Sequence, residues 1–202
     1  MSNNSNKKDL KDLLEHSLQY KEDQNKDFKL YDPVPVREFI NTQYYSGMEP
    51  GTMYDYWIDV IEDFVEGGYN EIIVTGSIGA GKTLAMNMLL MYKVYELFAH
   101  KNISKYLGFP AIQDIYNVYF SVSLTQAQRT GFKLFKEMID SSQWFNENFP
   151  RNKKINTVVE FPQNKFNVIS GSKTFALIHY NLNHKIILLR IYSVWLTRIE
   201  TL

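Results

Sequence analysis

Residues 76–83 read Gly76-Ser77-Ile78-Gly79-Ala80-Gly81-Lys82-Thr83, and this stretch decides the fold class of the chain. It is a complete G-x-x-x-x-G-K-[ST] motif. Glycines let backbone N–H groups converge on phosphate oxygens without a Cβ in the way. In such loops the lysine reaches the β- and γ-phosphates of a nucleotide, and the next hydroxyl ligates Mg²⁺. The motif therefore predicts a nucleotide-binding loop with Lys82 and Thr83 in these two roles.

The segments on either side of the loop fit a strand–loop–helix unit. Residues 71–75 form a short β-branched run that leads into Gly76 and predicts a buried strand. From residue 82 to about residue 100 no Pro or Gly interrupts the chain. Apolar residues cover most of the circumference of this predicted helix, so we expect it to be buried on more than one side. A chance match in a glycine-containing turn is the less favoured alternative, because all three parts are present.

Composition excludes several classes of protein. The 202 residues suffice for one α/β domain, or for one domain and an arm. With 22 basic and 22 acidic residues the formal net charge is zero. The net charge therefore gives no reason to expect binding to nucleic acids or to membranes. There is no cysteine, hence no disulfide framework and no thiolate metal site. We expect no signal peptide and no membrane span, since no apolar run approaches the roughly 18–20 residues required.

Residues 1–34 are predicted to form a polar N-terminal arm. Leucines at positions 10, 13, 14 and 18 share one face of a short amphipathic helix. This helix either packs loosely on the main domain or serves as a docking arm for a partner or a neighbouring subunit. The connector Asp32-Pro33-Val34-Pro35 is expected to be extended, because the residue before a proline avoids the α region.

The order of the remaining elements predicts a mainly parallel sheet. A helix is announced by the capping box Thr52-Met53-Tyr54-Asp55 and ended by Gly67-Gly68. After the loop helix, residues 101–114 are expected to be irregular. A strand is predicted at 116–123, followed by a helix to about residue 139 and one further turn before Pro150. Two more strands are predicted at 155–161 and 165–170, around the turn 162–164. Strands that alternate with helices indicate an α/β P-loop fold with helices on both faces of the sheet.

Several stretches beside the loop match one family pattern in the right order. They are residues 37–45 ahead of Tyr54-Asp55-Tyr56-Trp57, residues 121–128 after the second strand, residues 142–145 with Phe149-Pro150, and Phe161-Pro162-Gln163-Asn164 followed by residues 168–172. Together with the loop, this set resembles the ATPase domain of a tailed-phage terminase large subunit. The resemblance covers roughly residues 35–173.

This resemblance implies a P-loop NTPase fold of the additional-strand class, with ATP and Mg²⁺ as ligands. It implies a motor domain that couples ATP hydrolysis to translocation of duplex DNA into a viral capsid, with Lys82 as its catalytic phosphate lysine. The implied partners are duplex DNA, a portal ring, a small terminase subunit and further copies of the chain in the motor. The implied location is the host cell cytoplasm.

In this family the lead-in segment contacts the adenine. The resemblance therefore makes Tyr54, Tyr56 and Trp57 adenine candidates. Trp57 also lies on the apolar face of its predicted helix, so a core position is the favoured interpretation for that residue.

The family pattern breaks after residue 173. An active P-loop ATPase needs an apolar strand that ends in an Asp, which orders Mg²⁺, and a Glu, which polarises the attacking water. The apolar run at 186–196 ends in no such pair, and the only carboxylate after Glu160 is Glu200. We therefore expect a partial ATPase domain at 35–173 and a divergent tail at 174–202, left by a frameshift or an intervening sequence ahead of the nuclease domain. The alternative is a divergent protein whose acid lies elsewhere.

Other functional classes stay open. The chain is alternatively another P-loop NTPase, helicase-like or AAA-type, or a non-catalytic module that only binds a nucleotide or a partner. The basic turn at 151–154 is a candidate for contacts with DNA phosphates, although solvated surface is the favoured interpretation. Glu160 precedes Phe161-Pro162 in the predicted hairpin, and we expect it to be exposed rather than catalytic.

Overall fold

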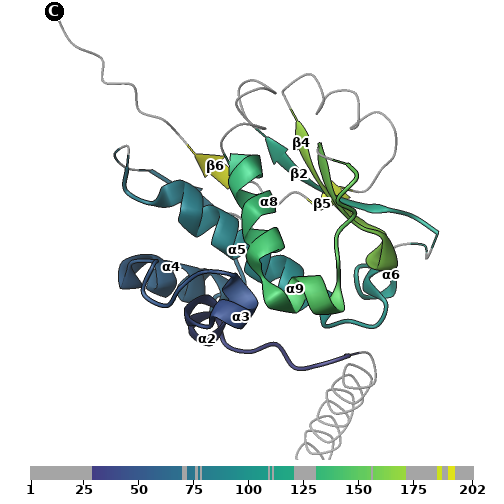
Figure 1. Cartoon of the computed structure of the whole chain (residues 1–202), viewed down its shortest axis with the longest axis horizontal. Coiled ribbons are helices and arrows are strands. Elements are labelled where there is room, and N and C mark those ends of the chain that lie inside the picture. Colours follow the sequence, from purple (N-terminus) through teal and green to yellow (C-terminus); the bar gives the residue numbers. More distant parts are fainter. Residues whose placement is uncertain are drawn as a thin grey trace, which may run out of the picture.

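The computed structural model describes residues 29–69, 72–75, 77, 79–108, 110, 112–120, 131–155, 157–171, 186–187 and 191–193. Figure 1 traces the elements along the chain. The helices are α2 (Val36–Asn41), α3 (Gln43–Ser46), α4 (Asp55–Glu66), α5 (Lys82–Phe98), α6 (Ile103–Tyr106), α8 (Gly131–Ser141) and α9 (Gln143–Asn148). The strands are β1 (Ile72–Val74), β2 (Ile115–Phe120), β3 (Val158–Phe161), β4 (Phe166–Gly171), β5 (Ile186–Ile187) and β6 (Ile191–Ser193).

The strands pair mainly in parallel, which confirms the predicted α/β class. One sheet has the order β3-β4-β2-β5, in which β2 is parallel to both β4 and β5. The hairpin of β3 and β4 is antiparallel and turns through the 3₁₀ segment Pro162–Asn164, as the sequence predicts. Strand β1, which leads into the loop, pairs in parallel with β6, with Val74 opposite Ser193. Two segments of the tail, β5 and β6, thus supply partners for β2 and β1.

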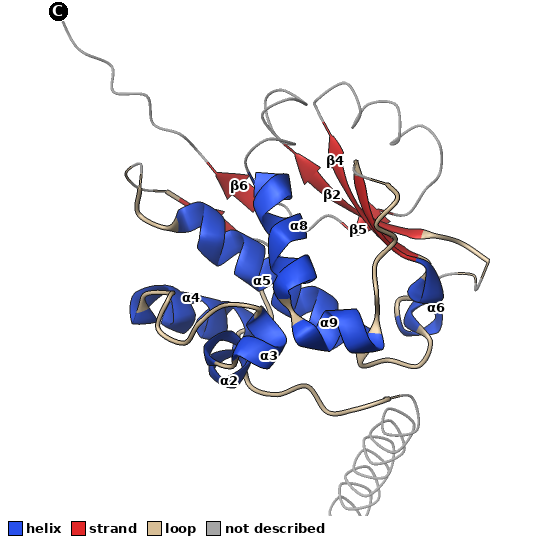
Figure 2. Cartoon of the chain, in the orientation of Figure 1, coloured by secondary structure: helices blue, strands red, loops and turns tan. Residues whose placement is uncertain are grey.

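Helix α5 lies at the centre of the core, as predicted for a helix buried on more than one side. It contacts α2, α4, α8 and β6. In Figures 1 and 2, α5, α8 and α9 lie between the group of α2, α3 and α4 and the four-stranded sheet. The buried residues of α5 are Lys82, Ala85, Met86, Asn87, Met88, Leu89, Leu90, Met91, Tyr92, Val94, Tyr95 and Phe98.

An aromatic cluster joins this helical layer to the hairpin. The ring of Phe98, at the end of α5, contacts rings from both hairpin strands and from α9 at centroid distances of 4.8–6.2 Å: Phe145, Phe149, Phe161 and Phe166. In β4 the side chains from Phe166 to Ser170 are all buried, so both faces of this strand are covered. Edge-to-face rings and two-sided burial fix the hairpin against α5.

The connector before α2 is tied to α5 by tyrosine side chains. The Tyr92 hydroxyl donates to the Val34 carbonyl at 2.9 Å, and the Tyr95 hydroxyl accepts from the Val34 N–H at 3.1 Å. The Tyr31 hydroxyl donates to the Tyr95 carbonyl at 2.5 Å. Pro35 is extended, with φ −55° and ψ 151°, as predicted for this segment. Burial raises the pKa of the Tyr31 and Tyr92 hydroxyls, so both remain protonated donors.

Three local predictions need correction. The capping box at Thr52 is wrong: α4 begins at Asp55 after Tyr54, and the Thr52 hydroxyl donates to the Glu49 carbonyl at 2.6 Å instead. The stretch 101–114 is not wholly irregular, because Asn102 caps the short helix α6. Strand β1 is buried only in part, since Ile73 is 64% exposed while Val74 is buried.

Other boundaries agree with the sequence. Helix α4 ends at Glu66 with Gly67 as its C-cap, α8 buries Phe132, Phe135, Met138 and Ile139, and α9 ends just before Phe149 and Pro150. Residues 121–130 and the arm at 1–28 lie outside the described residues, so the predictions there stay predictions. The proposed boundaries after residues 34 and 173 also stay predictions. Across the described part of the chain, no helix has both the length and the apolar character that a bilayer crossing requires.

Candidate phosphate-binding site

The loop between β1 and α5 has the backbone conformation that its glycines allow. Gly79 and Gly81 have φ values of +85° and +80°, in the left-handed region that favours glycine. Among the residues that the structure describes, a Cβ added at Gly79 would meet no atom within 4 Å, whereas one at Gly81 would lie 3.1 Å from the indole nitrogen of Trp57. Gly76 and Ile78 lie outside the described residues. The described part of the loop thus has one open side and one side packed against α4.

Lys82 is the first residue of α5 and its side chain folds back along the loop. Its ammonium group donates to the Ser77 carbonyl oxygen at 2.5 Å, and the residue is buried, at 8% exposure. Thr83 follows in the first turn and is half-buried. The geometry brings the Lys82 ammonium to the backbone of Ser77 within the same loop.

The N-terminal end of α5 has the electrostatics of an anion site. Gly81 occupies the N-cap position, and among the described residues no side chain caps the helix or places a carboxylate in its first turn. The first N–H groups of a helix lack partners within the helix and carry its positive dipole end. A phosphate oxygen accepts hydrogen bonds from these N–H groups, and its negative charge is stabilised by the positive end of the helix. These residues therefore fit the phosphates of a nucleotide.

The three aromatic candidates for adenine contact lie in different surroundings. Tyr54 and Tyr56 are exposed, at 74% and 67%. Trp57 is buried at 7% exposure, and its indole Nε1–H donates to the Ala80 carbonyl at 2.7 Å. The Tyr56 and Trp57 rings meet edge to face, with centroids 5.2 Å apart. Trp57 therefore has the core position that the sequence favoured, while Tyr54 and Tyr56 keep open ring faces.

The strand beside β1 brings no acid to the loop. Ser193, at the end of β6, pairs with Val74 of β1, so this segment lies where the chain approaches the loop. No Asp or Glu occurs in β6. Among the residues that the structure describes, no cluster of three or more His, Asp or Glu side chains is arranged to hold a metal ion.

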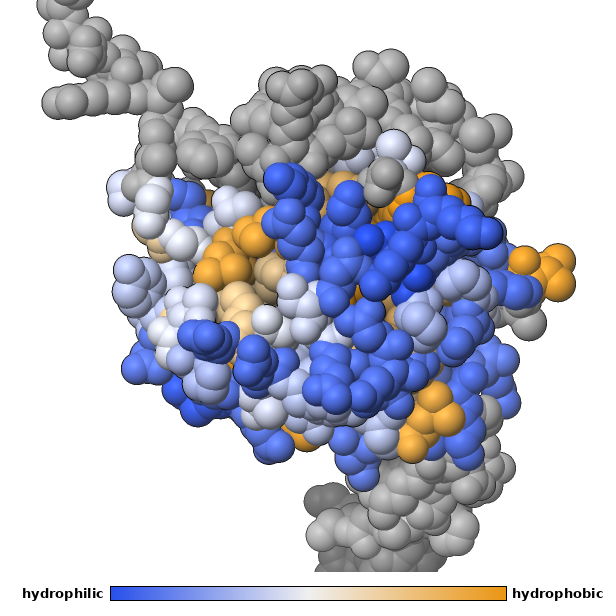
Figure 3. Space-filling view, in the orientation of Figure 1, coloured by the Kyte–Doolittle hydropathy of each residue, from blue (hydrophilic) through white to orange (hydrophobic). Residues whose placement is uncertain are grey.

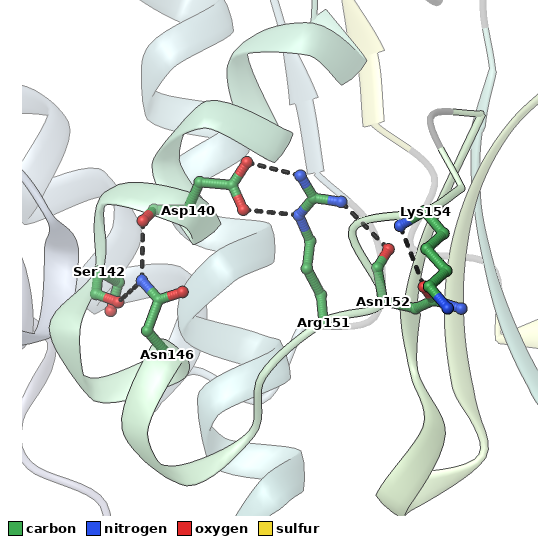
Figure 4. A network of polar contacts seen from close by, with 6 residues as sticks. All are labelled: Asp140, Ser142, Asn146, Arg151, Asn152 and Lys154. Atoms are coloured by element: carbon green, nitrogen blue, oxygen red, sulfur yellow. Dashed lines mark hydrogen bonds and ion pairs between the residues drawn. The ribbon is translucent and has the colours of Figure 1, made fainter.

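Arg151, in the basic turn, is neither a solvated side chain nor free to contact DNA in this structure. Its guanidinium donates to both carboxylate oxygens of Asp140 at 2.6 Å, and its side chain is only 6% exposed (Figure 4). Lys153 and Lys154 are exposed. Glu160 is half-buried rather than exposed, since its carboxylate accepts from the Asn152 amide at 2.8 Å. Sequence spacing alone gave no signal for either contact, because Arg151 and Asp140 come from different elements.

A cavity of about 480 Å³ lies away from the loop. Its lining includes Lys93 of α5, Tyr106 of α6, Asn117 of β2 and Phe166 of β4, together with Lys29 and His100 from outside these elements. His100 stacks on Tyr106 with ring centroids 3.6 Å apart. None of the described residues of the motif lines this cavity, so its size does not make it the phosphate site.

Comparison with known proteins agrees with the loop geometry. Residues 10–181 match the family model described as "Uncharacterized protein MJ0330, N-terminal P-loop domain". No curated protein matched the chain, and no solved structure did. The matched range contains the whole loop, both strands of the hairpin and most of the arm. Because the match spans most of the 202 residues of the chain, this chain belongs to the family of the MJ0330 N-terminal P-loop domain.

Proposed function

We propose that this chain binds ATP together with Mg²⁺ through residues 76–83. The observation that carries this proposal is the loop itself: left-handed glycines at 79 and 81, the buried ammonium of Lys82, and an α5 N-terminus without a side-chain cap. Bound phosphates would take the place of the Ser77 carbonyl as acceptors for Lys82. The Thr83 hydroxyl would hold the Mg²⁺, which neutralises charge on the phosphates.

For the base, the proposal assigns Tyr54 or Tyr56 as the stacking platform. Both rings are exposed and lie at the start of α4, the helix whose Trp57 contacts the loop. Stacking of an aromatic ring on a base contributes about 1–3 kcal/mol in nucleic-acid binding proteins. Trp57 offers less to the base, because it is buried and its N–H is engaged.

The wider proposal is a DNA-packaging motor of the terminase type. It rests on the order of motifs from residue 37 to residue 172. Duplex DNA, a portal ring, a small terminase subunit and neighbouring copies of the chain would then be partners, and the host cell cytoplasm the place of action. We propose slow hydrolysis in this chain, because β6 beside the loop strand carries no Asp or Glu to position water.

The first experiment measures ATP binding in the presence of Mg²⁺ by isothermal titration calorimetry. Lys82→Ala removes a charge-assisted donor, so we expect the Kd for ATP to rise about 10- to 100-fold. Lys93→Ala is the matched control, since Lys93 lies on the same helix and pairs with Glu96 at 2.8 Å. Wild-type protein without measurable binding would contradict the loop assignment in this chain.

The second experiment separates the functional classes by turnover. Stimulation of ATP hydrolysis by duplex DNA supports the motor, and stimulation by single strands alone supports a helicase-like enzyme. Tight ATP binding without turnover supports a non-catalytic nucleotide-binding module. If the wild-type protein hydrolyses ATP rapidly and Lys82→Ala abolishes this activity, the proposal of slow hydrolysis is wrong.

A further inference from the structure

Trp57 connects helix α4 to the backbone of the phosphate-binding loop. Its Nε1–H donates to the Ala80 carbonyl at 2.7 Å. Its ring also lies against Gly81, where an added Cβ would come within 3.1 Å of Nε1 and 3.5 Å of Cδ1. The ring therefore touches the two residues that immediately precede Lys82 and α5.

This hydrogen bond fixes the orientation of one peptide plane in the loop. The peptide that joins Ala80 to Gly81 is trans, so its carbonyl and its N–H point to opposite sides. With the carbonyl held toward α4, the Gly81 N–H is directed away from α4. Gly81 is left-handed and lacks the restraint of a side chain, so this peptide would otherwise be among the least constrained in the loop.

The donor itself is held firmly. Trp57 is buried, and α4 packs Ile58, Ile61 and Phe64 into the core. On its outer side, Asp59 and Glu62 of α4 accept from the Arg37 guanidinium of α2 at 2.5 and 2.9 Å. A donor on a helix fixed from two sides can restrain a loop without moving with it.

We propose that Trp57 is a positioning residue for phosphate binding: its indole N–H fixes the Ala80–Gly81 peptide so that the loop is preorganised for the anion. This inference rests on the proposed nucleotide binding for its effect on affinity, but its structural part does not. Fixing a loop in its bound conformation lowers the entropic cost of binding.

The test compares Trp57→Phe with Trp144→Phe. Trp144 lies on α9 in contact with Tyr31 and Tyr95, so its substitution perturbs an aromatic core without touching the loop. We expect Trp57→Phe to raise the Kd for ADP about fivefold, the effect of one lost hydrogen bond, and also to lower the thermal midpoint, because Trp57 is buried. Trp144→Phe is expected to lower the thermal midpoint and leave the Kd unchanged. The change in tryptophan fluorescence on ADP addition should vanish in Trp57→Phe and persist in Trp144→Phe.

A second variant removes the donor without changing the shape of the ring. Benzothienylalanine at position 57 replaces the N–H by sulfur, so a larger Kd in this variant cannot come from lost packing. Wild-type affinity in both position-57 variants would overturn the proposal.

Hydrogen exchange keeps the two proposals apart. Exchange of the amides at residues 79–85, measured without nucleotide, should be faster in both position-57 variants than in wild type or Trp144→Phe. If wild-type protein binds no ADP, the proposed function fails, while faster exchange still supports the positioning role. Unchanged exchange at 79–85 would overturn the positioning role whether or not nucleotide binds.

Discussion

At the scale of single residues, the phosphate-binding role of the loop can be predicted from the sequence, whereas the contacts that other elements make with the loop cannot. The spacing of Gly81, Lys82 and Thr83 predicts phosphate binding because the chemistry needs those residue types in that order. The bond from Trp57 to Ala80 has no such signature. It joins a side chain to a backbone carbonyl, and any residue at position 80 has that carbonyl.

The two left-handed glycines described in the loop, Gly79 and Gly81, make a matched pair for testing how Trp57 packs on the loop. Gly79→Ala and Gly81→Ala both force an L side chain into the left-handed region, which costs about 1–2 kcal/mol. Only at Gly81 does the new Cβ also press on Trp57. We expect Gly81→Ala to lower the free energy of unfolding more than Gly79→Ala, as measured by urea denaturation. Equal losses would mean that the Trp57 ring yields without cost.

His100 gives a prediction about pH. Burial lowers its pKa below the usual value, Lys29 adds to this effect and Glu96 opposes it. In the described structure its Nδ1 is buried without a hydrogen-bond partner. The unfolded chain therefore binds the proton first as the pH falls, and stability is lost below about pH 6.5, through the lower pKa of the folded state.

His100→Gln should remove this part of the pH dependence. Compared with wild type, the variant is expected to lose less free energy of unfolding between about pH 7 and pH 5. Urea unfolding at each pH measures the difference, in which other titrating groups cancel. Parallel curves for the two proteins would show that His100 carries the same pKa in both states.

At the scale of elements, the long periodic helices were predicted well, whereas the short helices α2, α3 and α6 were not. Helix α5 has seventeen residues and α8 eleven, enough for their apolar faces to be read. Helices α2, α3 and α6 have four to six residues, too few for periodicity, and they form against the core instead. The capping box at Thr52 failed because its hydroxyl has a nearer acceptor in the Glu49 carbonyl.

The ion pair between α8 and the turn after α9 stabilises their junction. Arg151 is almost wholly buried and makes a two-point contact with Asp140, so removing it leaves a carboxylate without its partner. We expect Arg151→Ala to lower the free energy of unfolding by about 2–3 kcal/mol. Lys153→Ala, at an exposed neighbour, is the control and should change it by less than about 0.5 kcal/mol. Similar small effects at both positions would mean that Arg151 is readily replaced by water.

At the scale of the whole molecule, the sequence predicted the layers but not the pairing of the strands. Alternating strands and helices were enough to infer a parallel sheet, and the hairpin from 158 to 171 was readable because its strands are adjacent in the chain. The pairing of β1 with β6 joins residues near 73 to residues near 192, a contact that one-dimensional patterns do not encode. In the sequence, the tail was considered only for the Asp and Glu that it lacks. The prediction therefore missed that the backbone of the tail pairs with β1 and β2.

The surface of the molecule shows which apolar side chains the core leaves exposed. On the face in Figure 3, apolar side chains lie in several separate places on a largely hydrophilic surface. The exposed large apolar residues include Tyr54 just before α4, Tyr56 in its first turn and Ile73 on β1. Ile73 leaves one side of the loop strand uncovered, so β1 depends on its strand pairing as well as on its buried Val74.

That dependence can be tested through the backbone of β6. Successive N–H groups of a strand point to opposite sides, so either Ile191→Pro or Tyr192→Pro removes a donor that faces β1. We expect at least one of these variants to lower the free energy of unfolding by about 1–3 kcal/mol more than alanine at the same position, which keeps the N–H. The same variant should weaken ATP binding, because β1 leads directly into the loop. If proline and alanine have equal effects at both positions, in urea denaturation and in ATP affinity, then β6 does not support the strand that carries the phosphate site.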